Sequence, residues 1–159
     1  MLIMKKLSPL VWLLLIGAVS LAVIQVFNEA DYVKADVIKL GGPSGNTLTI
    51  GAKCKGIVAD TSPERAQAIA EGLGNVIIER PSVYDVYVDT VKSFNISIDR
   101  VVLEKYDGQF YYSNIFVNSG EKILKIDSKP SDAVAVALRA KAPVYIKKDL
   151  LEKEGKGIC

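Results

Sequence analysis

Two segments of the chain that lie 67 residues apart resemble each other. The segments are 60–70 (DTSPERAQAIA) and 127–137 (DSKPSDAVAVA), and five of their eleven aligned positions are identical. Three of the identities are alanines, which are common, so the matched aspartate that opens each segment and the matched proline are the informative ones. Repetition at a fixed offset indicates that one structural unit is used twice. The sequence therefore predicts a domain built from two related halves.

Both halves show strand patterns followed by a capped helix pattern. Alternating or β-branched stretches between turn residues predict strands, at 36–40, 47–53, 56–59, 76–78 (short and buried), 97–106, 109–117, 122–127 and 142–146. Helix starts and apolar spacing predict helices, at 61–73, 83–94, 130–140 and 148–154. We expect an α+β fold of duplicated strand-helix units packed around one core, preceded by a single transmembrane helix.

The helix at 61–73 is expected to begin with a capping box from Thr61 to Glu64, and Ser128 is the expected N-cap of the helix at 130–140. Small residues dominate the face of this later helix. Its alanines predict close approach to a sheet or to the related helix.

The N-terminal part of the chain carries an apolar run from 7 to 27, without a charged residue. These 21 residues are long enough for a helix that crosses the hydrocarbon core of a bilayer. Lys5 and Lys6 precede the run, while Glu29 and Asp31 follow it, so the positive-inside rule places the domain outside the cytoplasm. We expect a single-pass membrane anchor, and the alternative is a secreted protein whose signal peptide is cleaved after 33–35.

These patterns divide the chain into four parts. They are a signal-anchor segment at 1–28, a linker with the first strand at 29–46, the main domain at 47–154 and a flexible tail at 155–159. The cysteines, Cys54 and Cys159, do not have metal-binding spacing. Outside the cytoplasm they could form a disulfide, although Cys159 could equally be free or link two chains.

The composition excludes several kinds of chemistry. The chain contains no histidine, which rules out an imidazole base, a Ser-His-Asp triad and a His-rich zinc site. Its net charge is only +2, which is not the charge of a strong nucleic-acid binder.

Several motifs resemble the bifunctional nuclease family. They are Arg80-Pro81, Asp107-Gly108 in a strand hairpin, the segment 126–137, Arg139 and Ala142-Pro143, and the match covers about 47–154. The resemblance implies an α+β fold with duplicated strand-helix units, activity on RNA and DNA as described for plant members, and a homo-oligomer, expected to be a dimer.

The chain departs from the family pattern at three places. Tyr84-Asp85 stands where the family usually has His-Asp, Lys129 replaces an arginine, and 53–62 carries extra residues. Lysine keeps the charge of the arginine but not its bidentate phosphate geometry.

A nuclease without histidine is expected to use carboxylates with Mg²⁺ or Mn²⁺, which take oxygen ligands and activate water. The candidate catalytic residues are Asp85, Asp127 and Asp132, of which Asp127 and Asp132 are the candidate metal ligands. The candidate phosphate-binding residues are Arg80, Lys129, Ser131 and Arg139. Strand alternation places one of Tyr111 and Tyr112 in the core, which argues against a base-stacking pair.

A structural role is the alternative for these charged residues. Asp127 and Asp132 lie near a predicted helix start, where the helix dipole stabilises acids, and the arginines could simply pair with them. Two functions therefore remain open. One is a membrane-tethered, metal-assisted phosphodiesterase acting on RNA or DNA, and the other is a non-catalytic binding or assembly module with the same fold.

Overall fold

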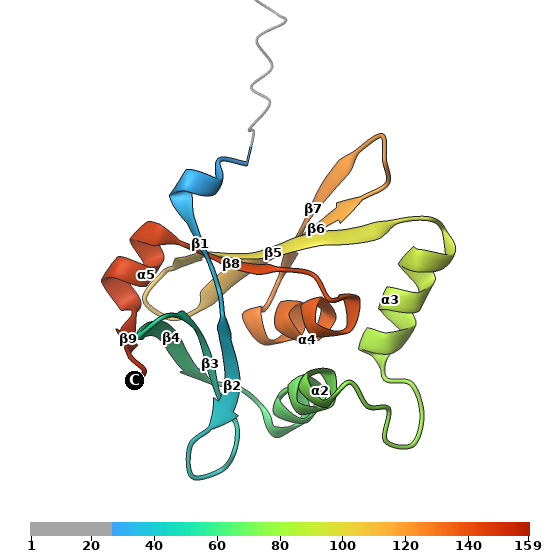
Figure 1. The fold of residues 1–159 in the computed structure, drawn as a ribbon. Coiled ribbons are helices and arrows are strands. Elements are labelled where there is room, and N and C mark those ends of the chain that lie inside the picture. The colour runs from blue at the N-terminus through green and yellow to red at the C-terminus, as the bar shows by residue number, and fades with distance from the viewer. Residues whose placement is uncertain (1–26) are drawn as a thin grey trace, which may run out of the picture.

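The computed structural model describes residues 27–159, which form a mixed α+β fold with two sheets (Figure 1). The predicted membrane anchor lies outside the described residues, apart from its last positions. Within residues 27–159, no helix is long and apolar enough to cross a membrane.

The larger sheet has five strands in the order β1-β8-β5-β6-β7. They are β1 (Tyr32–Lys34), β5 (Ser97–Tyr106), β6 (Tyr111–Asn118), β7 (Ile123–Ser128) and β8 (Val144–Lys147). The smaller sheet has the order β2-β3-β4-β9. Its strands are β2 (Val37–Gly41), β3 (Thr47–Ala52), β4 (Lys55–Asp60) and β9 (Lys156–Gly157). Among the strand pairs of residues 27–159, only β5–β8 is parallel.

The helices are η1 (Glu29–Asp31, a 3-10 turn), α2 (Pro63–Gly74), α3 (Val83–Ser93), α4 (Pro130–Ala140) and α5 (Lys148–Glu154). The predicted helices at 83–94, 130–140 and 148–154 are confirmed within one residue. Helix α3 is well specified locally, because Ser82 and Asp85 form a reciprocal capping box at its start.

The predicted duplication is visible as two antiparallel three-stranded meanders, β2-β3-β4 and β5-β6-β7, each followed by a helix. Both helices, α2 and α4, begin with proline, which lacks the N–H that a first turn leaves unpaired. Both end at a residue in the left-handed conformation, Asn75 and Lys141. The two halves thus share strand order, helix start and helix end.

Helices α2 and α4 lie side by side at the centre of the molecule (Figure 1). They run in the same direction, since Arg65 meets Asp132 near their N-termini and Gly72 meets Leu138 near their C-termini. A Cβ atom at Gly72 would lie 2.9 Å from the Cβ of Leu138, so the close approach requires glycine. Ala133, Ala135 and Ala137 are fully buried, which confirms the packing role expected of the alanines.

Two predicted helix caps are each off by one residue. The N-cap of α2 is Ser62, whose side chain accepts a hydrogen bond from the backbone N–H of Arg65, and not Thr61. The N-cap of α4 is Lys129, without a side-chain cap, and not Ser128. The reason is the same in both halves: proline takes the first helical position, so the residue directly before it becomes the cap.

The buried strand predicted at 76–78 is wrong. Val76, Ile77 and Ile78 are 52%, 55% and 64% exposed and belong to no strand. Their apolar, β-branched composition favours a strand, but α2 ends with its C-cap at Asn75 and the residues that follow pair with no described strand.

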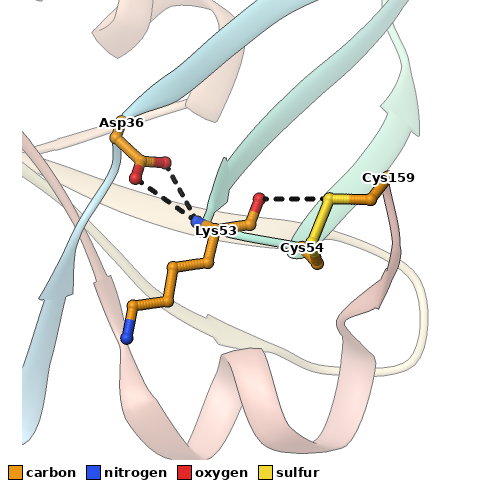
Figure 2. Close-up of a disulfide and its surroundings, with 4 residues drawn as sticks. All are labelled: Asp36, Lys53, Cys54 and Cys159. Carbon is orange, nitrogen blue, oxygen red and sulfur yellow. Dashed lines mark hydrogen bonds between the residues drawn. A yellow bond between two sulfur atoms is a disulfide. The ribbon is translucent and has the colours of Figure 1, made fainter.

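The C-terminal residues are held in place, where a flexible tail was expected. Strand β9 pairs with Lys55 and Gly56 of β4, and Cys159 forms a disulfide with Cys54 (Figure 2). Figure 2 also shows Asp36, whose carboxylate accepts hydrogen bonds from the backbone N–H of Lys53 beside this disulfide. Of the alternatives left open for the cysteines, the structure has the intrachain disulfide.

Candidate functional site

A cavity of about 700 Å³ lies between the two sheets, at the N-terminal ends of α2 and α4. Both halves of the repeat contribute to it. Its lining comprises Leu48, Ile50, Ile57, Ala59, Asp60, Thr61, Ser62, Arg65, Leu103, Tyr106, Gln109, Phe110, Tyr111, Tyr112, Asp127, Ser128, Lys129, Pro130 and Ser131. Strand residues form an apolar floor, aromatic residues form one wall, and the two helix starts supply polar groups.

The aromatic wall comes from the turn between β5 and β6. The rings of Tyr106 and Tyr111 stack with their centroids 4.4 Å apart. Phe110 follows the turn and is 57% exposed, although it is a large apolar side chain. The hydroxyl of Tyr106 donates to the carbonyl oxygen of Gly108 at 2.8 Å, which fixes its ring against the turn.

Asp107 holds this turn together. Its carboxylate accepts from the backbone N–H groups of Phe110 at 2.8 Å and Gln109 at 2.9 Å, and from the hydroxyl of Tyr112 at 2.7 Å. These hydrogen bonds lower the pKa of Asp107 to about 2, and the Phe110 N–H has the largest effect, ahead of the Tyr112 hydroxyl and the Gln109 N–H. The wall is therefore positioned before any ligand arrives.

The start of α4 supplies polar groups to the cavity. Lys129 is its N-cap residue and leaves the first turn without a side-chain cap. Ser131 follows in the first turn, and its side chain is largely buried. Unpaired backbone N–H groups, a lysine and a hydroxyl at a helix start are suited to binding an anion.

Asp127 lies at the rim of the cavity and not at its floor. It pairs across the sheet with Asn114, while the next residue, Ser128, pairs with the fully buried Ser113. Because neighbouring strand residues point to opposite faces, the Asp127 side chain points away from the core. Within residues 27–159, its carboxylate has no hydrogen bond or ion pair.

Asp60, the repeat counterpart of Asp127, also ends a strand at the cavity. Its carboxylate accepts a hydrogen bond of 2.6 Å from the hydroxyl of Thr47. The two repeats therefore bring one carboxylate each to the same cavity.

Two other predicted site residues, Asp85 and Arg139, meet away from this cavity. The Nε of Arg139 lies 2.7 Å from Oδ1 of Asp85 and its Nη2 lies 3.2 Å from Glu71. Its Nη1 donates to the carbonyl oxygens of Ala68 and Ala135. The Arg139 side chain is only 7% exposed, so it links α2, α3 and α4 inside the protein.

The environment of Asp85 favours its charged form. Burial raises its pKa, but hydrogen bonds from the side chain and backbone of Ser82 and from Arg139 together hold the pKa below its ordinary value. The Asp85 carboxylate thus both caps α3 and pairs with the buried Arg139.

Asp132 is also engaged. Its Oδ1 accepts from the Nε of Arg65 at 3.0 Å and from the hydroxyl of Tyr84 at 2.7 Å. Burial, together with the hydrogen bond to Asp132, raises the pKa of Tyr84 to about 12. Tyr84, which stands where the family usually has histidine, thus serves as a neutral hydrogen-bond donor.

Arg80 lies in the exposed segment between α2 and α3 and does not line the cavity. Of the predicted site residues, the structure brings Asp127, Lys129 and Ser131 to one cavity. It places Asp85, Asp132 and Arg139 in links between helices.

Sequence reasoning missed most of the aromatic wall. Tyr106, Phe110 and Tyr111 flank the Asp107-Gly108 turn, and this clustering is a signal that was available in the sequence. Tyr111 packs against the core, as the alternation predicts, but both Tyr111 and Tyr112 are half-buried and neither is a core residue. Both nevertheless line the cavity, which reaches the end of the hairpin.

Within residues 27–159, no group of three or more Cys, Asp or Glu side chains could hold a metal ion by itself. Asp60 and Asp127 are the carboxylates that line the cavity. One or two carboxylates are what Mg²⁺ commonly uses when substrate phosphates complete its shell. Among the described residues, these two carboxylates do not form an all-protein metal cage.

Residues 60–158 match the family model of the bifunctional nuclease domain. The match covers more than half of the chain, and the chain belongs to this family. The family motifs carry the strand-turn-helix geometry described above, with β7 and α4 at its centre.

The relatives include an uncharacterized protein of Mycobacterium tuberculosis, which is 32% identical over 91 residues, 57% of this chain and 53% of that protein. Bifunctional nuclease 1 of Arabidopsis thaliana is 30% identical over 84 residues, 51% of this chain and 26% of that protein. Bifunctional nuclease 1 of Oryza sativa subsp. japonica is 27% identical over 86 residues, 52% of this chain and 26% of that protein. The chain thus spans about half the length of the mycobacterial relative and about a quarter of the plant relatives.

Proposed function

We propose that this protein is a nuclease that cleaves phosphodiester bonds in RNA or DNA at the cavity between its two sheets. The observation that carries the proposal is that the uncapped start of α4, with Lys129 and Ser131, lines the same cavity as the aromatic wall. The names of the plant relatives support the same class of activity.

The start of α4 provides the phosphate site in this proposal. Backbone N–H groups of the first turn point out of the helix end, and the helix dipole adds partial positive charge there. Lys129 supplies a full positive charge at the same point. By comparison, the other helix that starts at the cavity, α2, uses Ser62 to cap its first turn, so the start of α4 is the more available of the two.

Asp127 is the candidate to orient or deprotonate the attacking water, because its carboxylate is exposed at the cavity rim and has no partner within the described residues. Mg²⁺ or Mn²⁺, held by Asp127 with Asp60 and a substrate phosphate, would neutralise phosphate charge and lower the pKa of bound water. Lys129 and the α4 start then bind and orient the phosphate.

A non-catalytic binding module remains the second candidate. It is favoured by the engagement of Asp85 and Asp132 in links between helices, which leaves few carboxylates for chemistry. The same cavity would then bind its ligand without cleaving it.

Location outside the cytoplasm on a membrane anchor is part of the proposal. The apolar run at 7–27 supports it, and so does the Cys54–Cys159 disulfide, because disulfides persist in oxidising compartments. Protease treatment of intact cells checks the location: degradation of the domain supports it, while protection overturns it.

A homodimer is also part of the proposal. Exposed apolar side chains are concentrated between Leu73 and Val86, and their burial in a second copy would remove them from water. Light scattering on the purified protein gives the mass: twice the chain mass supports the dimer, and the mass of one chain contradicts it.

The nuclease proposal is tested with purified full-length protein and labelled RNA and DNA, in Mg²⁺, in Mn²⁺ and in EDTA. The informative variant is Asp127→Asn, since Asp132→Asn would also disturb the link to Arg65 and Tyr84. Asp89→Asn, at an exposed helix position, is the matched control. Metal-dependent cleavage that is lost in Asp127→Asn and retained in Asp89→Asn supports the proposal, and equal cleavage by all three proteins, or none by the wild type, contradicts it.

A further inference from the structure

The size and lining of the cavity restrict what kind of nucleic acid can enter. A volume of about 700 Å³ falls within the range of pockets that take small molecules. Such a space accommodates one or two nucleotides and not a base-paired helix. An intact duplex would also present its bases already stacked on one another, with no free face for the aromatic wall.

We infer that the protein takes single-stranded nucleic acid, with an unstacked base inserted against Phe110 and the Tyr106–Tyr111 pair and its phosphate at the start of α4. This inference rests on the proposed function, because it assigns the substrate form of the same cavity. Stacking on aromatic side chains is tolerant of sequence, since every base has a π face, so one site serves RNA and DNA.

The aromatic wall has the properties of a prepared stacking platform. Phe110 is 57% exposed in the described protein, so its ring face is free to meet a ligand. The adjoining turn is fixed by three hydrogen bonds to Asp107, and Tyr106 is fixed by its bond to Gly108. A rigid platform loses little conformational freedom when it binds, which raises affinity.

The charges of the cavity complement a nucleotide. Lys129 and the start of α4 line the same cavity as the aromatic residues. Arg65 also lines the cavity; its Nε is committed to Asp132, and its terminal guanidinium nitrogens have no hydrogen bond within residues 27–159. The base and the phosphate of one nucleotide thus have an apolar and a cationic partner within one cavity.

The test is binding of a fluorescein-labelled twelve-residue oligothymidylate to the full-length protein in EDTA, followed by fluorescence anisotropy. The test variant is Phe110→Ala and the matched control is Phe94→Ala, because Phe94 is 73% exposed and lies outside the cavity lining. We expect Phe110→Ala to bind about 5- to 150-fold more weakly, while Phe94→Ala binds as the wild type does. Annealing the oligothymidylate to its complement should weaken binding by at least about tenfold.

Equal affinities of the two variants, or equal affinity for single strand and duplex, would overturn the inference. Because EDTA prevents metal-dependent cleavage, this measurement is independent of catalysis. If Phe110→Ala loses binding in a protein that does not cleave, the inference stands and the nuclease proposal fails. If the protein cleaves duplex and single strand alike and Phe110→Ala binds normally, the nuclease proposal stands and the inference fails.

Discussion

The Nε of Arg65 lies 3.0 Å from Oδ1 of Asp132, and these two residues occupy equivalent positions in the two repeats. The ion pair therefore joins the halves across the line along which the duplicated helices α2 and α4 meet. A second pair of equivalent positions meets near the C-terminal ends of the two helices, where the side chain of Arg139 lies close to Gly72. The first pair of equivalent positions holds opposite charges, and the second pair holds a large and a small residue.

A double-mutant cycle of Arg65→Ala and Asp132→Ala measures the coupling free energy between these two side chains. The side chains are 33% and 29% exposed, so solvent screens the pair and a coupling of about 0.5–1 kcal/mol is expected. The measurement is urea unfolding of the wild type, both single variants and the double variant. Strictly additive losses would show that the two charges do not stabilise the repeat interface.

Arg139→Ala should lower the free energy of unfolding by about 3–5 kcal/mol, because it leaves the largely buried carboxylates of Asp85 and Glu71 without their partner. Arg139→Lys should recover only part of this loss. Lysine lacks the planar guanidinium group through which Arg139 donates to four acceptor oxygens. The exposed Arg80→Ala is the control and should change the free energy by less than about 0.5 kcal/mol. A stable Arg139→Ala protein that has lost phosphate binding would instead restore the functional role predicted from sequence.

Asp107 should make the stability of the wild type depend on acid pH. Its pKa is lowered from 3.8 to about 2 in the folded protein, so the folded state is favoured while the carboxylate is charged. That contribution is present above about pH 4 and is lost as the pH falls through 2. Thermal unfolding of wild type and Asp107→Asn between pH 5 and 2 should show the wild-type advantage shrinking with falling pH, and a constant difference would contradict the assignment.

Lys129→Ala should weaken binding of single-stranded nucleic acid and reduce its salt dependence. Each phosphate neutralised by a lysine releases condensed counterions, so the slope of log affinity against log salt should fall by about 0.7 when one contact is lost. The exposed Lys148→Ala on α5 is the matched control. An unchanged slope in Lys129→Ala would remove this lysine from the phosphate site.

Local sequence signals predicted the helices and strands around the repeat well. Features that depend on contacts between distant parts of the chain could not be predicted from the sequence. Proline and the residues beside it locate the N-caps of α2 and α4 to within one position, because helix initiation depends on adjacent residues. The segment Val76–Ile78 was mistaken for a buried strand because its composition says nothing of whether a sheet edge is available. The pairing of β9 depends likewise on a partner about a hundred residues earlier in the chain.

The candidate site was predictable only in part for a related reason. The charged motif residues were recognised from the sequence. The sequence could not show that Arg139 pairs with Asp85, or that Asp132 accepts hydrogen bonds from Arg65 and Tyr84. The predicted site residues that do line the cavity are Asp127, Lys129 and Ser131. Their position depends on which faces of β7 and α4 pack toward the other repeat. The aromatic wall was overlooked because it becomes a wall only when the β5–β6 turn reaches the smaller sheet.

The disulfide between Cys54 and Cys159 joins positions 105 residues apart and should contribute strongly to stability. Crosslinking so long a loop restricts the unfolded chain, and its loss from a small domain typically costs about 2–5 kcal/mol. We therefore expect the Cys54→Ser/Cys159→Ser variant to melt at a lower temperature than the oxidised wild type. Dithiothreitol should lower the melting temperature of the wild type and leave the variant unchanged. If the reductant shifts both proteins equally, or neither, the crosslink does not provide this stability, and the pairing of β9 with β4 alone holds the C-terminus.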